Sequence, residues 1–151
     1  MYQKVSTNLN FVDREKETEK FWRENDIFQK SMKAREGCPT YTFYDGPPTA
    51  NGKPHIGHVL TRVIKDMIPR YRTMKGYMVP RKAGWDTHGL PVELEVEKML
   101  GLNGKEQIEE YGIEPFIEKC KESVWKYKGM WEDFSNTVGF WADMDHPYVT
   151  Y

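Results

Sequence analysis

The feature that most constrains the fold is the segment Tyr41–His58, in which a short apolar run leads through a Gly/Pro-rich turn toward a helix. Aromatic and β-branched residues bounded by Asp45-Gly46-Pro47-Pro48 predict a strand over Tyr41–Tyr44. A helix over 59–75, interrupted by Pro69, is predicted from apolar residues at helical spacing: Val59, Val63, Ile64, Met67 and Ile68. A helix start after such a turn offers phosphate unpaired backbone N–H groups and a partial positive charge. The segment therefore predicts a nucleotide site.

Two histidines, His55 and His58, stand where this turn meets the helix. Side chains three residues apart on a first helical turn project to one side, and Gly57 leaves room for a ligand to press on the backbone. The imidazoles could hydrogen-bond phosphate oxygens and stabilise charge in a transition state. They could also bind a metal, but two histidines without a third ligand nearby make a poor zinc site. We therefore predict phosphate binding and no metal site.

A second strand is expected over Tyr77–Gly84, followed by the polar turn Gly84–Pro91. Strand, helix and strand in so short a stretch make a βαβ unit, which implies a parallel sheet with a right-handed crossover. In open α/β sheets, ligands bind beyond the carboxyl ends of the strands. We expect both polar turns to face one crevice.

The remaining segments predict mostly helix. Residues 1–40 suggest an extended leader and one charged helix that Asp13 caps, and Pro91 starts a helix to about Leu100, before a short acidic one. The last third predicts one long helix, which starts near Pro115 and carries a heptad-like apolar stripe: Ile113, Ile117, Cys120, Val124, Tyr127, Trp131, Phe134 and Val138. The stripe could form a coiled-coil dimer, but packing on the sheet or on the first helix is favoured. The tail, 141–148, is expected to be loop.

Composition limits the class of protein. A chain of 151 residues with 38% hydrophobic and 30% charged residues suits one soluble globular domain, without a membrane span or signal peptide. Cys38 and Cys120 lack the spacing of a disulfide framework or a zinc site, and together these features favour the cytosol. Between residues 59 and 82, seven basic residues stand against one acid. This excess suits a polyanionic ligand, although a solvated helix face would give the same pattern.

The motif residues permit a comparison with known families. The segment 48–58, PTANGKPHIGH, resembles the signature of class I aminoacyl-tRNA synthetases, whose HIGH tetrapeptide corresponds to His55-Ile56-Gly57-His58. Within that class, three blocks are similar to isoleucyl-tRNA synthetases: Asp45-Gly46-Pro47-Pro48, Ala50-Asn51-Gly52 and Gly84–Glu93. The similarity runs from the Phe21-Trp22 pair to Asp145, which is nearly the whole chain.

The resemblance implies a reaction and a set of site residues. The isoleucine carboxylate would attack the α-phosphate of ATP, which binds with Mg²⁺ as substrate, and the acyl group would then pass to tRNA(Ile). No protein-bound metal is implied. His55 and His58 would be catalytic; the residues implied in ATP binding are Thr49, Asn51, Gly52, His55, Gly57 and His58. Those implied in amino-acid binding are Gly46 and Pro47 for the side chain and Asp86 for the ammonium group.

The expected fold is α/β: the first half of a Rossmann-like parallel-sheet nucleotide-binding fold, with an N-terminal helical arm and a long C-terminal helix. We expect the arm over residues 1–40, the half-fold over 41–140, and the start of a connection toward an editing domain over 141–151. The family's lysine-rich second ATP motif is not found.

Two alternatives stay open. The chain is part of a longer, cytoplasmic isoleucine-tRNA ligase, inactive by itself, or a truncated paralogue that binds nucleotide, tRNA or a partner without catalysis. A reading frame that continues into the second motif would separate them. An exposed sheet edge would also favour a dimer or strand swap of the isolated chain.

Overall fold

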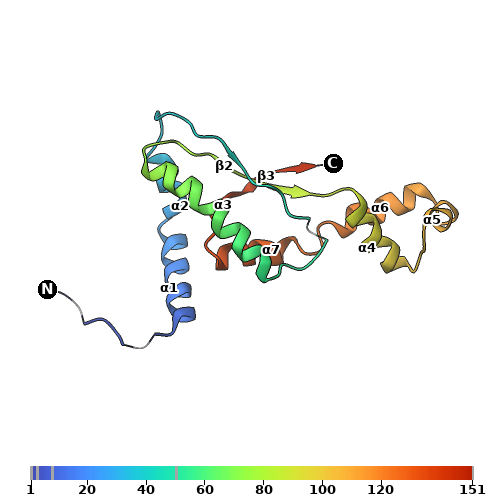
Figure 1. Ribbon diagram of the computed structural model, residues 1–151, viewed down its shortest axis with the longest axis horizontal. Coiled ribbons are helices and arrows are strands. Elements are labelled where there is room, and N and C mark those ends of the chain that lie inside the picture. Colours follow the sequence, from blue (N-terminus) through green and yellow to red (C-terminus); the bar gives the residue numbers. More distant parts are fainter. Residues whose placement is uncertain (1, 3, 8, 50, 151) are drawn as a thin grey trace.

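The computed structural model describes residues 2, 4–7, 9–49 and 51–150, and over these residues it combines a three-stranded sheet with helices (Figure 1). Ala50, which belongs to one of the matching sequence blocks, lies outside the described residues. The elements follow in the order α1 (Phe11–Glu24), α2 (Ile27–Lys33), β1 (Phe43–Tyr44), α3 (Ile56–Met74), β2 (Arg81–Asp86), α4 (Leu90–Leu100), α5 (Lys105–Tyr111), α6 (Ile113–Ser123), α7 (Lys128–Thr137) and β3 (Asp143–Thr150).

The sheet has the order β1-β2-β3 with all strands parallel, which confirms the predicted βαβ unit and parallel sheet. Phe43 of β1 lies opposite Arg81 of β2, and Trp85 of β2 lies opposite Val149 of β3. The crossover helices α3 and α7 are neighbours, because the guanidinium of Arg62 in α3 lies over aromatic rings of α7. The sheet therefore positions one end of α3 against α7.

The two predicted strands have different bounds in the structure. β1 is confined to Phe43–Tyr44, and β2 begins at Arg81 and continues to Asp86 instead of ending at Gly84. Pro80 has no N–H to donate to a ladder, so the regular strand begins after it. Gly84 stays inside β2 because its missing side chain leaves room for the ring of Tyr148 on β3.

The expectation that the tail is loop was wrong, since residues 143–150 form β3. Turn chemistry is present locally: the backbone N–H of His146 donates to the Asp143 carboxylate at 3.1 Å. This turn lies opposite the register shift between Lys82 and Gly84 of β2. β3 therefore carries extra residues at the turn but stays paired with β2 on both sides of it. Pairing with the distant β2 outweighs the local turn signal.

The predicted long C-terminal helix is two helices, α6 and α7, separated by residues 124–127. The apolar stripe serves two different partners. α6 packs on α4, whereas Trp131 of α7 packs on Trp85 of β2, with Trp125 from the break beside it. Packing of the stripe on the sheet is thus confirmed for α7, and the break lets each helix take its own direction.

α3 is one helix, and Pro69 does not interrupt it. Pro69 is buried inside the helix, and its carbonyl accepts a hydrogen bond from the Thr73 hydroxyl at 2.8 Å. The missing N–H of a proline removes one helical hydrogen bond, and burial of the ring offsets that loss. The helix also begins earlier than the apolar pattern indicated, at Ile56, with His55 as its N-cap.

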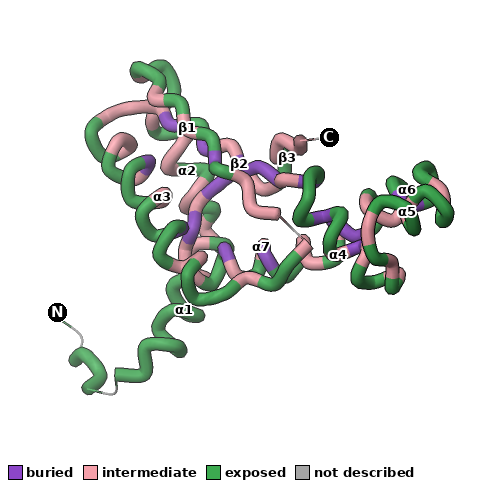
Figure 2. Tube along the Cα trace, turned by 45° about the vertical axis from the view of Figure 1, so that its right-hand side comes forward, coloured by how far each residue is buried: buried purple, intermediate pink, exposed green. Residues whose placement is uncertain are grey.

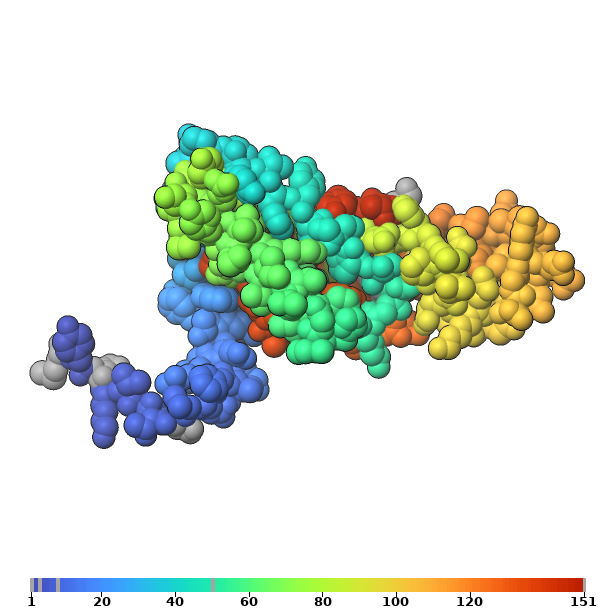
Figure 3. Space-filling model, in the orientation of Figure 1, coloured from blue at the N-terminus to red at the C-terminus, as the bar shows by residue number. Residues whose placement is uncertain are grey.

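The N-terminal arm contains two helices instead of one. α1 is capped by Asn10, whose side chain accepts from the backbone N–H of Asp13 at 3.3 Å; Asp13 therefore lies in the first turn and is not the cap. Asp26, with a φ of 50°, separates α1 from α2. α1 extends away from the sheet toward the N-terminus (Figures 1 and 3).

Burial is concentrated along β2, where Ala83 and Trp85 are each 1% exposed (Figure 2). Trp85 forms one core cluster with Trp131, and Ala83 forms another with Phe140 and Ala142. Helices α4–α6 form a separate lobe at the end opposite α1 (Figure 1). In the described part of the chain, no helix has both the length and the apolarity needed to span a bilayer.

Candidate nucleotide-binding site

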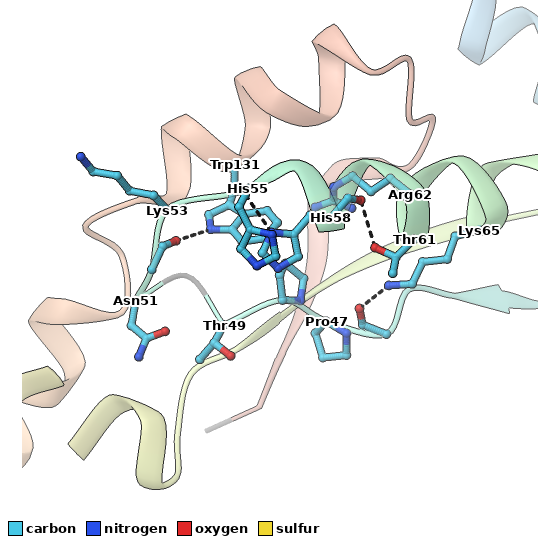
Figure 4. Close-up of a pocket in the computed structure, with 13 residues that line it drawn as sticks. Pro47, Thr49, Asn51, Lys53, His55, His58, Thr61, Arg62, Lys65 and Trp131 are labelled. Carbon is cyan, nitrogen blue, oxygen red and sulfur yellow. Dashed lines mark hydrogen bonds between the residues drawn. The ribbon is translucent and has the colours of Figure 1, made fainter. Parts of the chain in front are cut away.

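A cleft of about 470 Å³ opens where the turn after β1 meets the N-terminus of α3 and the first turns of α7 (Figure 4). Its walls come from three places in the chain. The lining residues are Gly46, Pro47, Pro48, Thr49, Asn51, Gly52, Lys53, His55, His58, Thr61, Arg62, Lys65 and Trp131.

The histidine pair forms a reciprocal cap on α3. The Nδ1 atom of His55 accepts from the backbone N–H of Gly57 at 3.1 Å, and the Nδ1 atom of His58 accepts from the backbone N–H of His55 at 3.0 Å. The two rings lie 3.7 Å apart between centroids, which confirms that both project to one side. Two N–H groups that a helix start leaves unpaired are thereby satisfied by the site residues themselves.

These hydrogen bonds fix the protons of the two rings. Because each Nδ1 atom accepts, each neutral ring of His55 and His58 carries its proton on Nε2, which stays available as a donor. The pKa of His58 is lowered from its ordinary 6.5, first by burial and then by His55, Arg62 and Lys65. At neutral pH the His58 ring is therefore a neutral hydrogen-bond donor.

Gly57 has a structural reason to lack a side chain. A Cβ atom there would lie 3.0 Å from Cε1 and 3.1 Å from Nδ1 of His55. Glycine at this position lets the ring of His55 fold back over the first turn without a tight contact. Gly57 does not line the cleft, and its implied part in ATP binding stays a prediction.

Trp131 is a cleft residue that the sequence did not single out for the site. Its indole N–H donates to the carbonyl of Gly52 at 2.8 Å, and its ring packs edge-on against His58 with centroids 4.7 Å apart. It is 3% exposed. Trp131 of α7 thus contacts both the turn, at Gly52, and the helix cap, at His58. The heptad pattern indicated that Trp131 is buried but not which residues it contacts.

A cluster of charged side chains, which was not predicted from the sequence, lies beside the turn that follows β1. The Asp45 carboxylate is paired with Lys65 at 2.9 Å and with Arg62 at 3.7 Å. Burial lowers the pKa of Arg62, and Asp45 offsets part of that shift. A signal was available in the sequence: His58, Arg62 and Lys65 follow at i, i+4 and i+7, which places them on one face of α3.

Seven of the predicted site residues line the cleft: Gly46, Pro47, Thr49, Asn51, Gly52, His55 and His58. Lys53, also in the wall, extends away from the ring pair (Figure 4). Within the described ranges, no group of three or more His, Cys, Asp or Glu side chains is arranged to hold a metal ion.

Asp86 lies beside the cleft and not in its wall. It ends β2, its backbone N–H donates to Pro48 at 3.0 Å, and Thr49 pairs with it in an isolated parallel bridge. Its carboxylate accepts from the Thr150 hydroxyl at 3.3 Å. The amide of Asn51 also donates to the carbonyl of Pro91 at 2.8 Å. The two polar turns are therefore adjacent, but no residue of Gly84–Pro91 lines the cleft, so the expected shared crevice stays a prediction.

Comparisons with known proteins agree with this fold. A family model described as tRNA synthetases class I (I, L, M and V) matches residues 17–151. The chain is 64% identical over 151 residues to an isoleucine–tRNA ligase of Clostridium novyi, covering 100% of this chain and 14% of that protein. It is 60% identical over 148 residues to an isoleucine–tRNA ligase 2 of Bacillus cereus, covering 98% of this chain and 14% of that protein.

A solved structure shares the fold at low sequence identity. The LeuRS of Agrobacterium radiobacter, in a ternary complex with tRNA and LeuAMS, matches with a TM-score of 0.64 and 20% identity, over 95% of this chain and 16% of that chain. This chain thus spans only 14% of the length of either curated relative. Because the family model covers nearly all of the sequence, and the parallel sheet and the histidine-capped helix accompany it, the chain belongs to the class I tRNA synthetases (I, L, M and V).

Proposed function

We propose that this chain supplies the ATP-binding half of an amino-acid-activating site in a longer isoleucine–tRNA ligase. The observation that carries the proposal is the histidine pair: His55 and His58 cap α3 through their Nδ1 atoms and keep two Nε2–H donors for a ligand. Donors at a helix N-terminus, beside a cleft with a surplus of positive charge, suit a polyphosphate. The names of the curated relatives support isoleucine as the amino acid.

The chemistry is a displacement at the α-phosphate. A carboxylate oxygen of isoleucine forms a bond to phosphorus, the bond to the bridging oxygen breaks, and pyrophosphate leaves with that oxygen and its electron pair. Such a reaction needs positioning and charge stabilisation more than a protein nucleophile. His55 and His58 donate to the phosphate oxygens, with Thr49, Asn51 and Gly52 around the nucleotide. Mg²⁺ enters with ATP as substrate.

The amino acid lies at the other end of the turn. Asp86 pairs with the ammonium group, while Gly46 and Pro47 border the side chain. Support comes from adjacency: Asp86 is bridged to Thr49, and Gly46 and Pro47 line the same cleft as the histidines. A Cβ on Gly46 would lie 3.5 Å from Nζ of Lys65, so glycine leaves this corner open.

The proposal extends to the whole enzyme. The acyl group passes from the adenylate to tRNA(Ile) in the cytoplasm, and the other domains of the enzyme complete the site. Within the chain, residues 1–40 act as an arm, 41–140 as the half-fold and 141–151 as the start of the connection onward. A dimer or strand swap of the isolated chain through its sheet edges stays a prediction.

The test is amino-acid-dependent exchange of pyrophosphate into ATP by the enzyme from the complete reading frame. We expect exchange with isoleucine, much weaker exchange with valine, which lacks one methylene, and none above background with leucine or without an amino acid. An enzyme that binds ATP but supports no exchange with any of these amino acids would contradict the proposal and favour a non-catalytic relative.

A further inference from the structure

The charge cluster behind the cleft carries a surplus positive charge. Asp45 follows β1 and is 2% exposed, and its carboxylate pairs with two cations of α3, Arg62 and Lys65. Two cations against one carboxylate leave one positive charge without a partner among these three residues, which we term the Asp45 cluster. The buried charges of Asp45 and Arg62 compensate each other, so the surplus charge lies on the partly exposed Lys65 and can pair with an anion in the cleft.

Arg62 is held in place as the permanent partner of Asp45. It is 3% exposed, and its guanidinium lies over the rings of Phe140 at 4.6 Å and Trp131 at 5.3 Å. Its Nε atom has no hydrogen-bond partner in the described part of the chain. Aromatic rings on its faces and burial leave Arg62 little freedom to reach a ligand. Lys65 is therefore the cation of the Asp45 cluster that can contact a ligand.

Lys65 has one donor left. Its ammonium group donates to Oδ1 of Asp45 at 2.9 Å and to the carbonyl of Gly46 at 2.8 Å. An ammonium group has three N–H bonds, and the described residues offer no third acceptor within hydrogen-bond distance. The side chain is 33% exposed and lines the cleft beside Pro47 and Thr61 (Figure 4). The third N–H is thus available to a molecule in the cleft.

We propose that Lys65 is an anion-binding residue of the cleft, whose free N–H and surplus charge pair with a carboxylate or phosphate group of a substrate. The inference rests on the proposed function, which places two anions here: the α-phosphate of ATP and the carboxylate of isoleucine. Asp45 and the Gly46 carbonyl hold the ammonium group in position, so little side-chain freedom is lost on binding. The positive charge of Lys65 also acts on His58, since it contributes to the lowered pKa of that ring.

The experiment removes the positive charge of Lys65 and measures which substrate then binds more weakly. In the complete enzyme carrying Lys65→Met, KM for isoleucine and for ATP is measured by pyrophosphate exchange, together with the inhibition constant of isoleucinol. Isoleucinol keeps the ammonium group but replaces the carboxylate with a neutral CH₂OH. A charged hydrogen bond is worth roughly tenfold or more in affinity, which sets the expected change.

Two results support the inference and identify the anion. A rise of about tenfold or more in KM for isoleucine, with isoleucinol and ATP unchanged, assigns Lys65 to the carboxylate. A similar rise for ATP alone assigns it to phosphate. Lys65→Gln, which can still donate to Asp45 but carries no charge, should reproduce the change, whereas Lys65→Arg should stay closer to wild type.

Other results overturn it. Unchanged constants for isoleucine and ATP in Lys65→Met and Lys65→Gln would exclude a binding role, and an equal loss for isoleucine and isoleucinol would indicate that Lys65 only supports the cleft wall. A wild-type enzyme without isoleucine-dependent exchange contradicts the proposed function instead. The two failures are therefore distinguishable. Lys105→Met serves as a control for the loss of a lysine charge, because Lys105 is an exposed residue of α5 that pairs with Glu109 and does not line the cleft.

Discussion

Gly84→Ala tests how the Tyr148 side chain of β3 packs on β2 and bonds to the turn after β1. Gly84 lies in the buried centre of β2, and a Cβ atom there would sit 2.3 Å from Cζ and 2.4 Å from Cε1 of the Tyr148 ring. Its φ is not in the left-handed region, so the cost of alanine is steric and not conformational. The ring of Tyr148 must move, and its hydroxyl then loses the hydrogen bond that it donates to the carbonyl of Asp45.

The magnitude follows from these two contacts. Overpacking a buried site costs about 1–3 kcal/mol, and the lost hydrogen bond adds about 1 kcal/mol. We expect the free energy of unfolding to fall by about 2–4 kcal/mol, which for a chain of this size lowers the thermal midpoint by roughly 4–16 °C. Circular dichroism of the 151-residue chain measures the midpoint, and urea titration measures the free energy.

A double-mutant cycle isolates the clash. Tyr148→Ala removes the ring, so Gly84→Ala in that background should cost less than about 0.5 kcal/mol. Tyr148→Phe removes only the hydroxyl and should cost about 1 kcal/mol. An equal cost of Gly84→Ala with and without the Tyr148 ring would refute the reasoning, because the alanine would then be harmful for another cause.

Two further predictions concern the cap and its support. Trp131→Phe keeps a ring beside His58 but loses the hydrogen bond to the carbonyl of Gly52. We therefore expect the free energy of unfolding to fall by about 1 kcal/mol and the KM for ATP of the complete enzyme to rise several-fold. Trp125→Phe is the control, because the ring of Trp125 packs on Trp85, and it should leave the KM for ATP unchanged. The folded pKa of His58 lies below its unfolded value, so below about pH 6.5 the unfolded chain binds the proton more tightly and stability falls. The thermal midpoint should drop more steeply between about pH 7.5 and about pH 5.5 in wild type than in His58→Gln, and parallel curves would contradict this reading.

The sequence predicted best what is decided locally. The strand–turn–helix order, the shared side of His55 and His58, and the helix that ends at Leu100 all depend on residues within a few positions of each other. Cap and turn chemistry acts over that range, so these patterns can be recognised without knowing the fold. The family resemblance added predicted site residues that local chemistry could not assign, such as Asp86.

The errors concern contacts between distant parts of the chain. β3 is a strand because it pairs with β2, although its own residues favour a turn. The heptad stripe was assigned to one helix, because periodicity shows that a face is buried but not against what. Trp131 holds a carbonyl 79 positions away, and no local pattern indicates such a contact.

The central claim is that the histidine pair holds ATP for adenylation. His58→Ala in the complete enzyme tests it most directly, because it removes an Nε2–H donor and leaves Asp86 and Lys65 in place. We expect isoleucine-dependent pyrophosphate exchange to slow by about 100-fold or more, with loss of the cap costing only about 1 kcal/mol in stability. His146→Ala, an exposed histidine on β3 paired with Asp143, should exchange at the wild-type rate. An unchanged exchange rate in His58→Ala would contradict the account.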